Sequence, residues 1–224
     1  MQNLGLDILD LITIERLLFG LYFTLEVAFI SIIITLFLGT IFGILRTSDR
    51  LLIRVPFRLY LEVVRVLPTL VLLYLLYYIL PKIVDIDISG RIVGIFAFSF
   101  WGVAEMSDIV RSSILSLPKH QRESGQAIGL NPFQLFRYLL LPQALKIAIA
   151  PALNLSARII MTTSLLVLIG VQDVIKVGKE IIEYAAMTNN PMAPFWIYGL
   201  ILLIFFLICY PLSKLASKLY KNHS

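Results

Sequence analysis

Long runs of hydrophobic residues, separated by shorter polar stretches, dominate the chain. Five runs are long enough, or nearly so, to cross a hydrocarbon core about 30 Å thick as helices that rise about 1.5 Å per residue. They span residues 20–45, 59–80, 92–110, 147–170 and 195–212. None of them alternates polar and apolar residues as the strands of a membrane barrel do. The pattern predicts an all-α, polytopic membrane protein with five transmembrane helices.

The first 19 residues do not look like a cleavable signal peptide. Residues 1–19 carry three acidic side chains and the single basic Arg16, and they lack a small-residue cleavage site. Apolar residues recur at helical spacing between Leu4 and Ile14. We therefore expect a short amphipathic segment that lies on the outer surface of the membrane.

The segment 111–146 separates the third and fourth apolar runs and is too polar to cross the membrane. Loops of this length are usually functional or disordered. Pro118 and Pro132 fit the starts of short helices, because proline is tolerated in the first helical turn. Gly125 and Gly129 allow close backbone approach or a turn. The sequence predicts a polar loop with short helices between the third and fourth spans.

Composition excludes a soluble domain. Hydrophobic residues make up 59% of the chain and charged residues 15%, and the mean hydropathy is +0.90. Soluble domains contain roughly 45–50% apolar and about 25% charged residues. A chain of this composition is expected to pack helix against helix within lipid.

Basic residues are divided unevenly between the two faces of the five-span arrangement. One face holds twelve: Arg46, Arg50, Arg54, Arg58, Arg111, Lys119, Arg122, Arg137, Lys146, Lys214, Lys218 and Lys221. The other holds five: Arg16, Lys82, Arg91, Lys176 and Lys179. Lysine and arginine collect on cytoplasmic loops, so the first face is predicted to be cytoplasmic. The N-terminus then lies outside and the C-terminus inside, and the net charge of +5 requires no nucleic-acid partner.

The chain offers no recognisable catalytic or metal site. His120 and His223 lie in polar stretches without partners for a triad or a metal, and the single Cys209 excludes an internal disulfide. The phosphate-binding pattern G-x-x-x-x-G-K-[ST] does not occur. We expect a protein that is not an enzyme and holds no cofactor of its own.

Several ordered motifs carry a resemblance to a known family. Glu123 is followed by two small residues, by Gly129 and by Leu141–Pro142. This pattern resembles the EAA loop of importer permeases in ATP-binding-cassette (ABC) transporters, specifically the polar-amino-acid permeases of the histidine, glutamine and arginine type. Four further motifs match the same family: Gly20–Leu21–x–x–Thr24–Leu25, Tyr60–x–Glu62–x–x–Arg65–x–x–Pro68, Thr163–Ser164–Leu165–Leu166 and Ile169–Gly170.

The resemblance implies that the cytoplasmic loop forms a coupling helix seated in a groove of a separate ATPase subunit. Glu123 would cap or orient the short helix, and Gly129 would let the chain turn. Ser124 and Gly125 stand where two alanines are usual, and both remain small. The residues expected to couple to the ATPase are Glu123, Ser124, Gly125, Ala127, Gly129, Leu141 and Pro142.

The same resemblance implies the other partners. Two permease subunits would surround a central pathway in the bacterial cytoplasmic (inner) membrane, and two ATPases, which bind ATP and Mg, would lie beneath them. A soluble or tethered substrate-binding protein would dock outside, and the segment 172–194 is one candidate surface. The substrate would be an amino acid. The sequence leaves open which amino acid it is, and whether the dimer is formed with a second copy or a related permease.

Ionisable residues inside the membrane are functional candidates by default. We interpret Glu26 as structural. Glu62 with Arg65, and Asp108 with Arg111, are each spaced three apart and are predicted to form pairs along one helix face.

Glu105 and Arg158 allow two interpretations. They either form an ion pair across the bundle, or they bind the ammonium and the carboxylate of a zwitterionic substrate. The family resemblance adds Asn154, and Thr162, Thr163 and Ser164 offer neutral hydrogen bonds nearby in sequence.

Two alternatives to an ABC permease predict other sequence features. An ion-coupled secondary transporter predicts inverted repeats and interrupted helix pairs in both halves, and the sequence shows no repeat. A membrane scaffold without a transport pathway would not need charges such as Glu105 and Arg158 at membrane depth.

Overall fold

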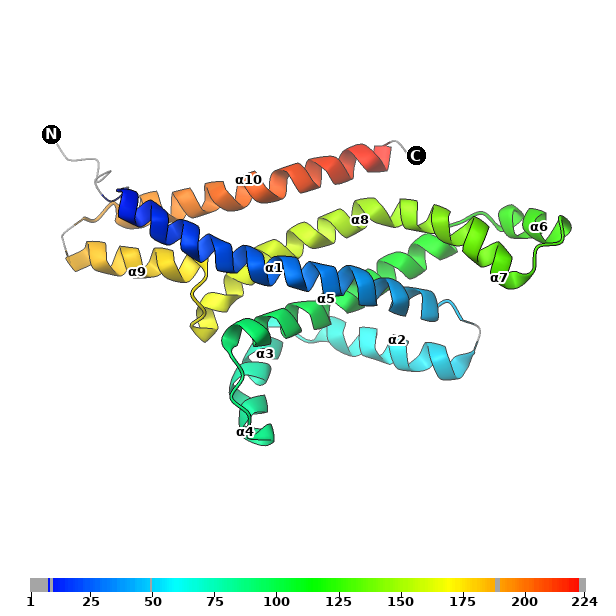
Figure 1. Ribbon diagram of the computed structural model, residues 1–224, viewed down its shortest axis with the longest axis horizontal. Coiled ribbons are helices and arrows are strands. Elements are labelled where there is room, and N and C mark those ends of the chain that lie inside the picture. Colours follow the sequence, from blue (N-terminus) through cyan, green and yellow to red (C-terminus); the bar gives the residue numbers. More distant parts are fainter. Residues whose placement is uncertain (1–7, 9, 49, 188–189, 222–224) are drawn as a thin grey trace. The chain divides into compact units, whose positions relative to one another are not determined.

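The computed structural model describes residues 8, 10–48, 50–187 and 190–221, and these residues form helices joined by short connections, with no strand among them (Figure 1). The helices in chain order are α1 (Leu11–Leu45), α2 (Leu51–Val66), α3 (Thr69–Tyr74), η2 (Leu75–Ile79), α4 (Leu80–Val84), α5 (Gly90–Leu115), α6 (Lys119–Ala127), α7 (Pro132–Gln134), η3 (Leu135–Leu140), α8 (Leu141–Thr162), η4 (Thr163–Ile169), α9 (Val174–Met187) and α10 (Ala193–Lys221). The predicted all-α class is confirmed.

Within the described residues, four helical segments are long and apolar enough to cross a membrane. They are Leu11–Leu45, Gly90–Leu115, Pro132–Ile169 and Ala193–Lys221. A bent pair, Leu51–Val66 with Thr69–Val84, makes a fifth if it is counted as one span. Four of the five predicted spans coincide with these segments, and the fifth, 59–80, falls on the bent pair.

The second predicted span, 59–80, was wrong as a continuous helix. Helix α2 ends at Val66, and Leu67 adopts extended backbone angles, φ −75° and ψ 121°. The cause is Pro68, whose ring disfavours the helical conformation in the residue before it. A new helix, α3, begins directly afterwards at Thr69.

Helix α1 starts nine residues before the predicted first span, so residues 11–19 are its first turns rather than a separate segment. Its start is fixed by Asp10, whose Oδ1 accepts a hydrogen bond from the Thr13 backbone N–H at 2.8 Å. Hydrogen bonds from the backbone and side chain of Thr13 lower the pKa of the Asp10 carboxyl. Residues 1–7 and 9 lie outside the described residues, and the surface location of the segment 1–19 stays a prediction.

The chain forms two compact units, each assembled from three sequence segments. One unit comprises Met1–Ser31, Thr69–Phe98 and Arg158–Pro211, and the other comprises Ile32–Pro68, Ser99–Ala157 and Leu212–Ser224.

Each unit has its own apolar core. In the first unit α9 packs against α1 and α10 (Figure 1), and the buried residues of this cluster are Leu17, Val174, Val177, Ile181, Ile197 and Ile201. In the second unit α2 packs against α5 through Leu61, Val64 and Ala104. These cores hold the helices that carry the candidate sites described below.

Candidate functional site

Helix α6 contains the residues that resemble the coupling helix. It follows Pro118, whose extended ψ of 138° precedes the first helical turn. It ends at a glycine turn: Gly129 has φ +84°, and the Leu130 N–H donates to the Gly125 carbonyl at 3.1 Å. A positive φ is rarely adopted by other residues, so Gly129 fits the predicted role in turning the chain.

Gly125 is the buried residue of α6 and lies against η3. A Cβ atom at this position would collide with the Leu135 side chain. Ser124, the second position where the family has alanine, is exposed. The close approach expected of a small residue therefore occurs at Gly125, which seats α6 on the start of the following helix.

The connection from α6 to the next helix is built by a capping box. The Asn131 side chain accepts from the Gln134 backbone N–H at 2.8 Å, and the Gln134 side chain accepts from the Asn131 N–H at 3.0 Å. Pro132 occupies the first turn, as predicted. From Pro132 the chain is helical without a gap to Ile169.

Most of the predicted loop 111–146 is therefore helical. Helix α5 continues to Leu115, and irregular backbone is limited to residues 116–118 and 128–131. Leu141 and Pro142 lie at the start of α8 inside a continuous helical stretch rather than in a loop. The polarity of residues 111–146 led to a predicted loop that is too long, because helices can extend beyond the membrane with polar residues exposed.

The side of α6 that faces away from η3 is exposed and includes apolar residues at its end. Glu123 and Ala127 of α6 are exposed, Ile128 is 77% exposed, and Phe133 is 72% exposed. Pro118, at the N-cap position of α6, makes no side-chain capping hydrogen bond, and the role of Glu123 in capping or orienting the helix stays a prediction. The element has one face packed on η3 and another, partly apolar face available to a partner.

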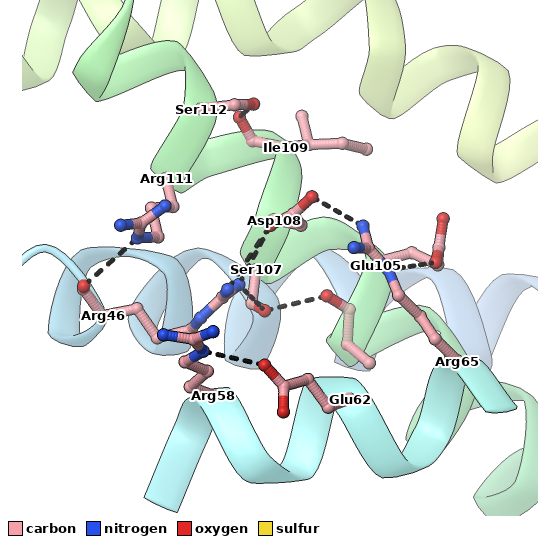
Figure 2. Close-up of polar contacts among 11 residues, drawn as sticks. Arg46, Arg58, Glu62, Arg65, Glu105, Ser107, Asp108, Ile109, Arg111 and Ser112 are labelled. Carbon is pink, nitrogen blue, oxygen red and sulfur yellow. Dashed lines mark hydrogen bonds and ion pairs between the residues drawn. The ribbon is translucent and has the colours of Figure 1, made fainter. Parts of the chain in front are cut away.

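A polar cluster joins helices α1, α2 and α5 in the second unit (Figure 2). The Arg46 side chain, which follows α1, is only 6% exposed and donates to Ser107 Oγ at 3.1 Å and to Asp108 Oδ1 at 3.4 Å. Arg65 of α2 donates to Asp108 Oδ2 at 2.6 Å and lies 3.6 Å from Glu105 Oε1. Asp108 and Glu105 of α5 thus connect α5 to α1 and α2.

Burial lowers the pKa of the Arg46 guanidinium, and the charge of Asp108 opposes that effect. Arginine nevertheless remains charged at physiological pH. Asp108 is therefore the counter-ion of a buried cation, and both of its oxygens are engaged.

Two predicted pairs were wrong. Glu62 binds Arg58 at 2.7 Å instead of Arg65. Arg111 donates to the Arg46 carbonyl at 3.4 Å, while Asp108 binds Arg46 and Arg65. The observed partner of Glu62 lies four residues away on the same helix, whereas Asp108 is bound by arginines from neighbouring helices.

The proposed substrate residues are distributed over both compact units. Glu105 and Asn154 belong to one unit, and Arg158 belongs to the other. Asn154 is exposed and lines a cavity of about 770 Å³. Whether Glu105 and Arg158 pair or bind a substrate stays a prediction.

The hydroxyl residues that follow Arg158 lie in the same unit as Arg158. Thr162 Oγ1 donates to the Arg158 carbonyl at 2.7 Å, and Thr163 Oγ1 donates to the Ile160 carbonyl at 2.6 Å. Ser164 is half-buried within η4. The two threonines retain lone pairs that can accept hydrogen bonds.

Glu26 has a structural partner. Its carboxylate lies 3.6 Å from Arg91, and the Arg91 guanidinium lies 4.4 Å from the centre of the Phe23 ring. This arrangement agrees with the structural interpretation of Glu26. Across the described residues, no group of histidine, cysteine, aspartate and glutamate side chains is arranged to hold a metal ion.

Comparison with known proteins identifies the family. The sequence profile described as "Binding-protein-dependent transport system inner membrane component" matches residues 35–220. The chain belongs to this family. It is a membrane-spanning permease component of an ABC transport system.

Curated relatives of this permease cover most of its length. It is 32% identical over 192 residues to the probable amino-acid ABC transporter permease protein YckA of Bacillus subtilis (strain 168), covering 85% of this chain and 81% of the relative. It is 31% identical to the probable glutamine ABC transporter permease protein GlnP of the same organism, covering 89% and 90%. It is 30% identical to the arginine transport system permease protein ArtQ, also from that organism, covering 94% of both chains.

Solved structures share the fold of the permease. A chain of an amino acid ABC transporter crystallised with histidines superposes with a TM-score of 0.81 at 22% identity, covering 93% of this chain and 94% of that chain. A chain of the MetNI methionine ABC transporter in an inward-facing conformation gives 0.74 at 18% identity, covering 94% and 99%.

One functional candidate of the permease was missed in the sequence. Asp173 precedes α9 and is fully buried, with Oδ1 accepting from the Lys176 N–H at 2.9 Å. Burial raises the pKa of its carboxyl to about 6. Its position before a helix is a typical N-cap signal. Asp173 is buried by α1, which approaches closely because Gly20 has no side chain. A Cβ atom at Gly20 would lie only 3.0 Å from backbone atoms of Asp173 and Val174.

Proposed function

We propose that the permease is the membrane subunit of an ATP-driven importer of polar amino acids. The observation that carries the proposal is α6, a short helix with a packed face at Gly125 and an exposed face at Glu123, Ala127 and Ile128, in a chain of the permease family. Two of the relatives are named for glutamine and arginine transport, which supports an amino-acid substrate.

Movement of an ATPase subunit would reach the membrane through a short rigid path. Gly125 brings α6 into contact with Leu135 of η3, and the capping box of Asn131 fixes the chain between them. Leu135 belongs to the helical stretch Pro132–Ile169, which is itself a candidate span. A force on α6 would therefore displace the start of that span instead of being absorbed by a flexible loop.

The cluster around Asp108 would make its unit respond as one body. Arg46, Arg65 and Asp108 connect the ends of α1, α2 and α5 through charge-assisted hydrogen bonds. Such bonds resist separation of the three helices when one of them is displaced.

The remaining parts of the importer come from partners. ATP and Mg would bind to the ATPase subunit, and the permease itself performs no catalysis. A second permease subunit would complete the pathway, and a substrate-binding protein would deliver the amino acid at the outer face. The permease would have its N-terminus outside the inner membrane and its C-terminus in the cytoplasm.

Substrate recognition is proposed at Glu105, Asn154, Arg158 and the hydroxyl residues Thr162, Thr163 and Ser164. If Arg158 binds the substrate carboxylate, Arg158→Gln is expected to reduce uptake of the transported amino acid with the complex still assembled. The measurement is the KM and maximal rate of uptake in proteoliposomes. An unchanged KM and rate would contradict the role of Arg158.

The proposed function is tested by reconstitution. The permease is purified with its ATPase, inserted into proteoliposomes, and supplied with radiolabelled glutamine, arginine or histidine and the substrate-binding protein. We expect uptake with ATP and Mg, and none with a non-hydrolysable ATP analogue. Uptake driven by a sodium or proton gradient without ATP would identify a secondary transporter instead.

A further inference from the structure

A cavity of about 770 Å³ is walled by three helices of the second unit: the end of α5, the middle of α8 and the end of α10. Its polar lining includes Ser112, Ser113, Ser116, Lys146, Asn154 and Ser217. Cavities of about 300–1,000 Å³ hold small molecules, and a few polar groups in their walls fix the orientation of the ligand. The size and the lining of this cavity therefore fit a small polar ligand.

The α5 wall of the cavity can accept further hydrogen bonds but has no hydroxyl proton left to donate. Ser113 Oγ donates to the Ile109 carbonyl at 2.8 Å, and Ser116 Oγ donates to the Ser113 carbonyl at 2.9 Å. Ser112 Oγ also donates to the Ile109 carbonyl, at 2.9 Å. A hydroxyl has one proton and two lone pairs, so each oxygen keeps an acceptor. The C-terminal end of a helix favours positive charge, and this wall therefore suits an ammonium group.

The α8 wall of the same cavity offers a positive charge. Lys146 lines the cavity, and none of the described residues in the lining is acidic, so its ammonium group has no counter-ion there. Asn154, two turns further along α8, offers both an amide donor and a carbonyl acceptor. This wall suits a carboxylate, which forms charge-assisted hydrogen bonds with an ammonium group.

We propose that this cavity binds the transported amino acid from the cytoplasmic side of the permease, and that its occupation slows import. The carboxylate would bind Lys146, and the α-ammonium group would bind the oxygens of Ser113 and Ser116. The side chain would lie against the apolar part of the α8 wall at Ile147 and Pro151. A zwitterion complements both walls, whereas an inorganic anion or a simple amine complements only one of them.

A ligand in the cavity would restrain the helix on which α6 acts. Helix α8 belongs to the continuous stretch Pro132–Ile169, whose start packs against α6 at Gly125. An amino acid bound to both α8 and α5 resists displacement of one helix relative to the other. Product that accumulates in the cytoplasm would thereby oppose further import. The inference rests on the proposed function for the class of ligand and for the side of the membrane.

Binding is measured without transport. The permease is purified in detergent with its ATPase but without the substrate-binding protein, and is titrated with radiolabelled glutamine and arginine. Lys146→Gln should weaken binding at least tenfold, because the charge-assisted hydrogen bond to the carboxylate is lost. The matched control is Lys218→Gln, which removes an exposed charge from the end of α10 outside the lining and should leave binding unchanged. No saturable binding of either amino acid, or equal binding by Lys146→Gln, would overturn the proposal.

Arg158 distinguishes this cavity from the substrate site proposed above. Arg158 follows Lys146 by twelve residues and is not among the residues that line the cavity. Arg158→Gln should therefore retain the binding that Lys146→Gln loses. If Arg158→Gln abolishes binding and Lys146→Gln retains it, the bound amino acid lies at Arg158 and the proposal is wrong.

Regulation is measured in proteoliposomes that hold ATP and Mg on the ATPase side. The amino acid that binds in detergent is added unlabelled to that side, and initial uptake of the labelled amino acid should fall severalfold. The N-acetylated amino acid, which lacks the ammonium group, should not inhibit, and Lys146→Gln should relieve the inhibition. Equal inhibition of Lys146→Gln and the unaltered permease would contradict regulation through this cavity. Absence of ATP-driven uptake would reject the proposed function, while the titration in detergent still decides whether the cavity binds an amino acid.

Discussion

Asp173 is a carboxyl group enclosed by apolar packing, with backbone hydrogen bonds that only partly compensate its burial. Thr24 completes the surroundings: its Oγ1 accepts from the Val174 N–H at 3.1 Å and donates to the Gly20 carbonyl at 3.0 Å. Burial disfavours the charged form, so the pKa of Asp173 rises to about 6. The protonated acid is therefore more favoured in the folded chain than in the unfolded chain.

This preference predicts a pH-dependent stability. The pKa in the unfolded chain is about 3.9, so the contribution of Asp173 is complete below pH about 4 and is lost as the pH rises through 6. The free energy of unfolding should fall by up to about 3 kcal/mol over that range, at 1.36 kcal/mol per pKa unit. Asp173→Asn should remove the dependence and raise the melting temperature at neutral pH.

The measurement is thermal unfolding in detergent between pH 4 and pH 8. Asp87→Asn is the matched control, because Asp87 is exposed. If Asp173→Asn keeps the pH dependence of the unaltered permease, Asp173 is not its source.

Asp108 gives a second prediction at this scale. Removing the partner of a buried charge costs roughly 3–5 kcal/mol, whereas a surface pair contributes about 1 kcal/mol or less. Since Asp108 is partly exposed, Asp108→Ala should destabilise the permease by about 3 kcal/mol. Glu62→Ala, which breaks the exposed pair with Arg58, should cost under about 1 kcal/mol. Equal melting temperatures for the two variants would show that Arg46 does not depend on Asp108.

At the scale of elements, α6 and η3 act together because a glycine allows their contact. Gly125→Val should force α6 away from Leu135 and uncouple ATP hydrolysis from uptake, with the complex still assembled. A second change, Leu135→Ala, opens space for the added methyl groups and should restore part of the coupling. The measured quantity is amino acid transported per ATP hydrolysed. A normal ratio in Gly125→Val alone would contradict the packing role.

The sequence predicted those elements whose signal is local. Apolar runs located four spans, Pro118 and Pro132 located short helices, and Gly129 located a turn. The break at Leu67 was missed because the apolar run continues across Pro68, so hydrophobicity outweighed the proline. The Asp108 cluster was missed because its partners come from three helices, and spacing within one helix cannot identify them.

The burial of Asp173 was missed in the sequence for the same reason. Its place before α9 could be recognised in the sequence, whereas its enclosure depends on α1, more than 140 positions earlier in the chain. Functional residues fixed by tertiary packing therefore required the structure, and those fixed by turns and caps did not.

At the scale of the whole molecule, the permease combines apolar spans with a short external helix that can receive force. The continuous stretch Pro132–Ile169, whose start packs against α6, is itself a candidate span. Membership of the ABC permease family implies an ATPase partner. The proposed coupling therefore requires a physical and energetic connection between that partner and α6.

The most direct test is ATP hydrolysis stimulated by substrate and binding protein in the purified complex with the ATPase. Glu123→Ala removes an exposed charge from α6, and Gly129→Asp places a side chain on a backbone with φ +84°. Both should abolish most of the stimulation without dissociating the complex, whereas Glu62→Ala, which removes an exposed charge from α2, should retain it. Full stimulation in both α6 variants would contradict coupling through this helix.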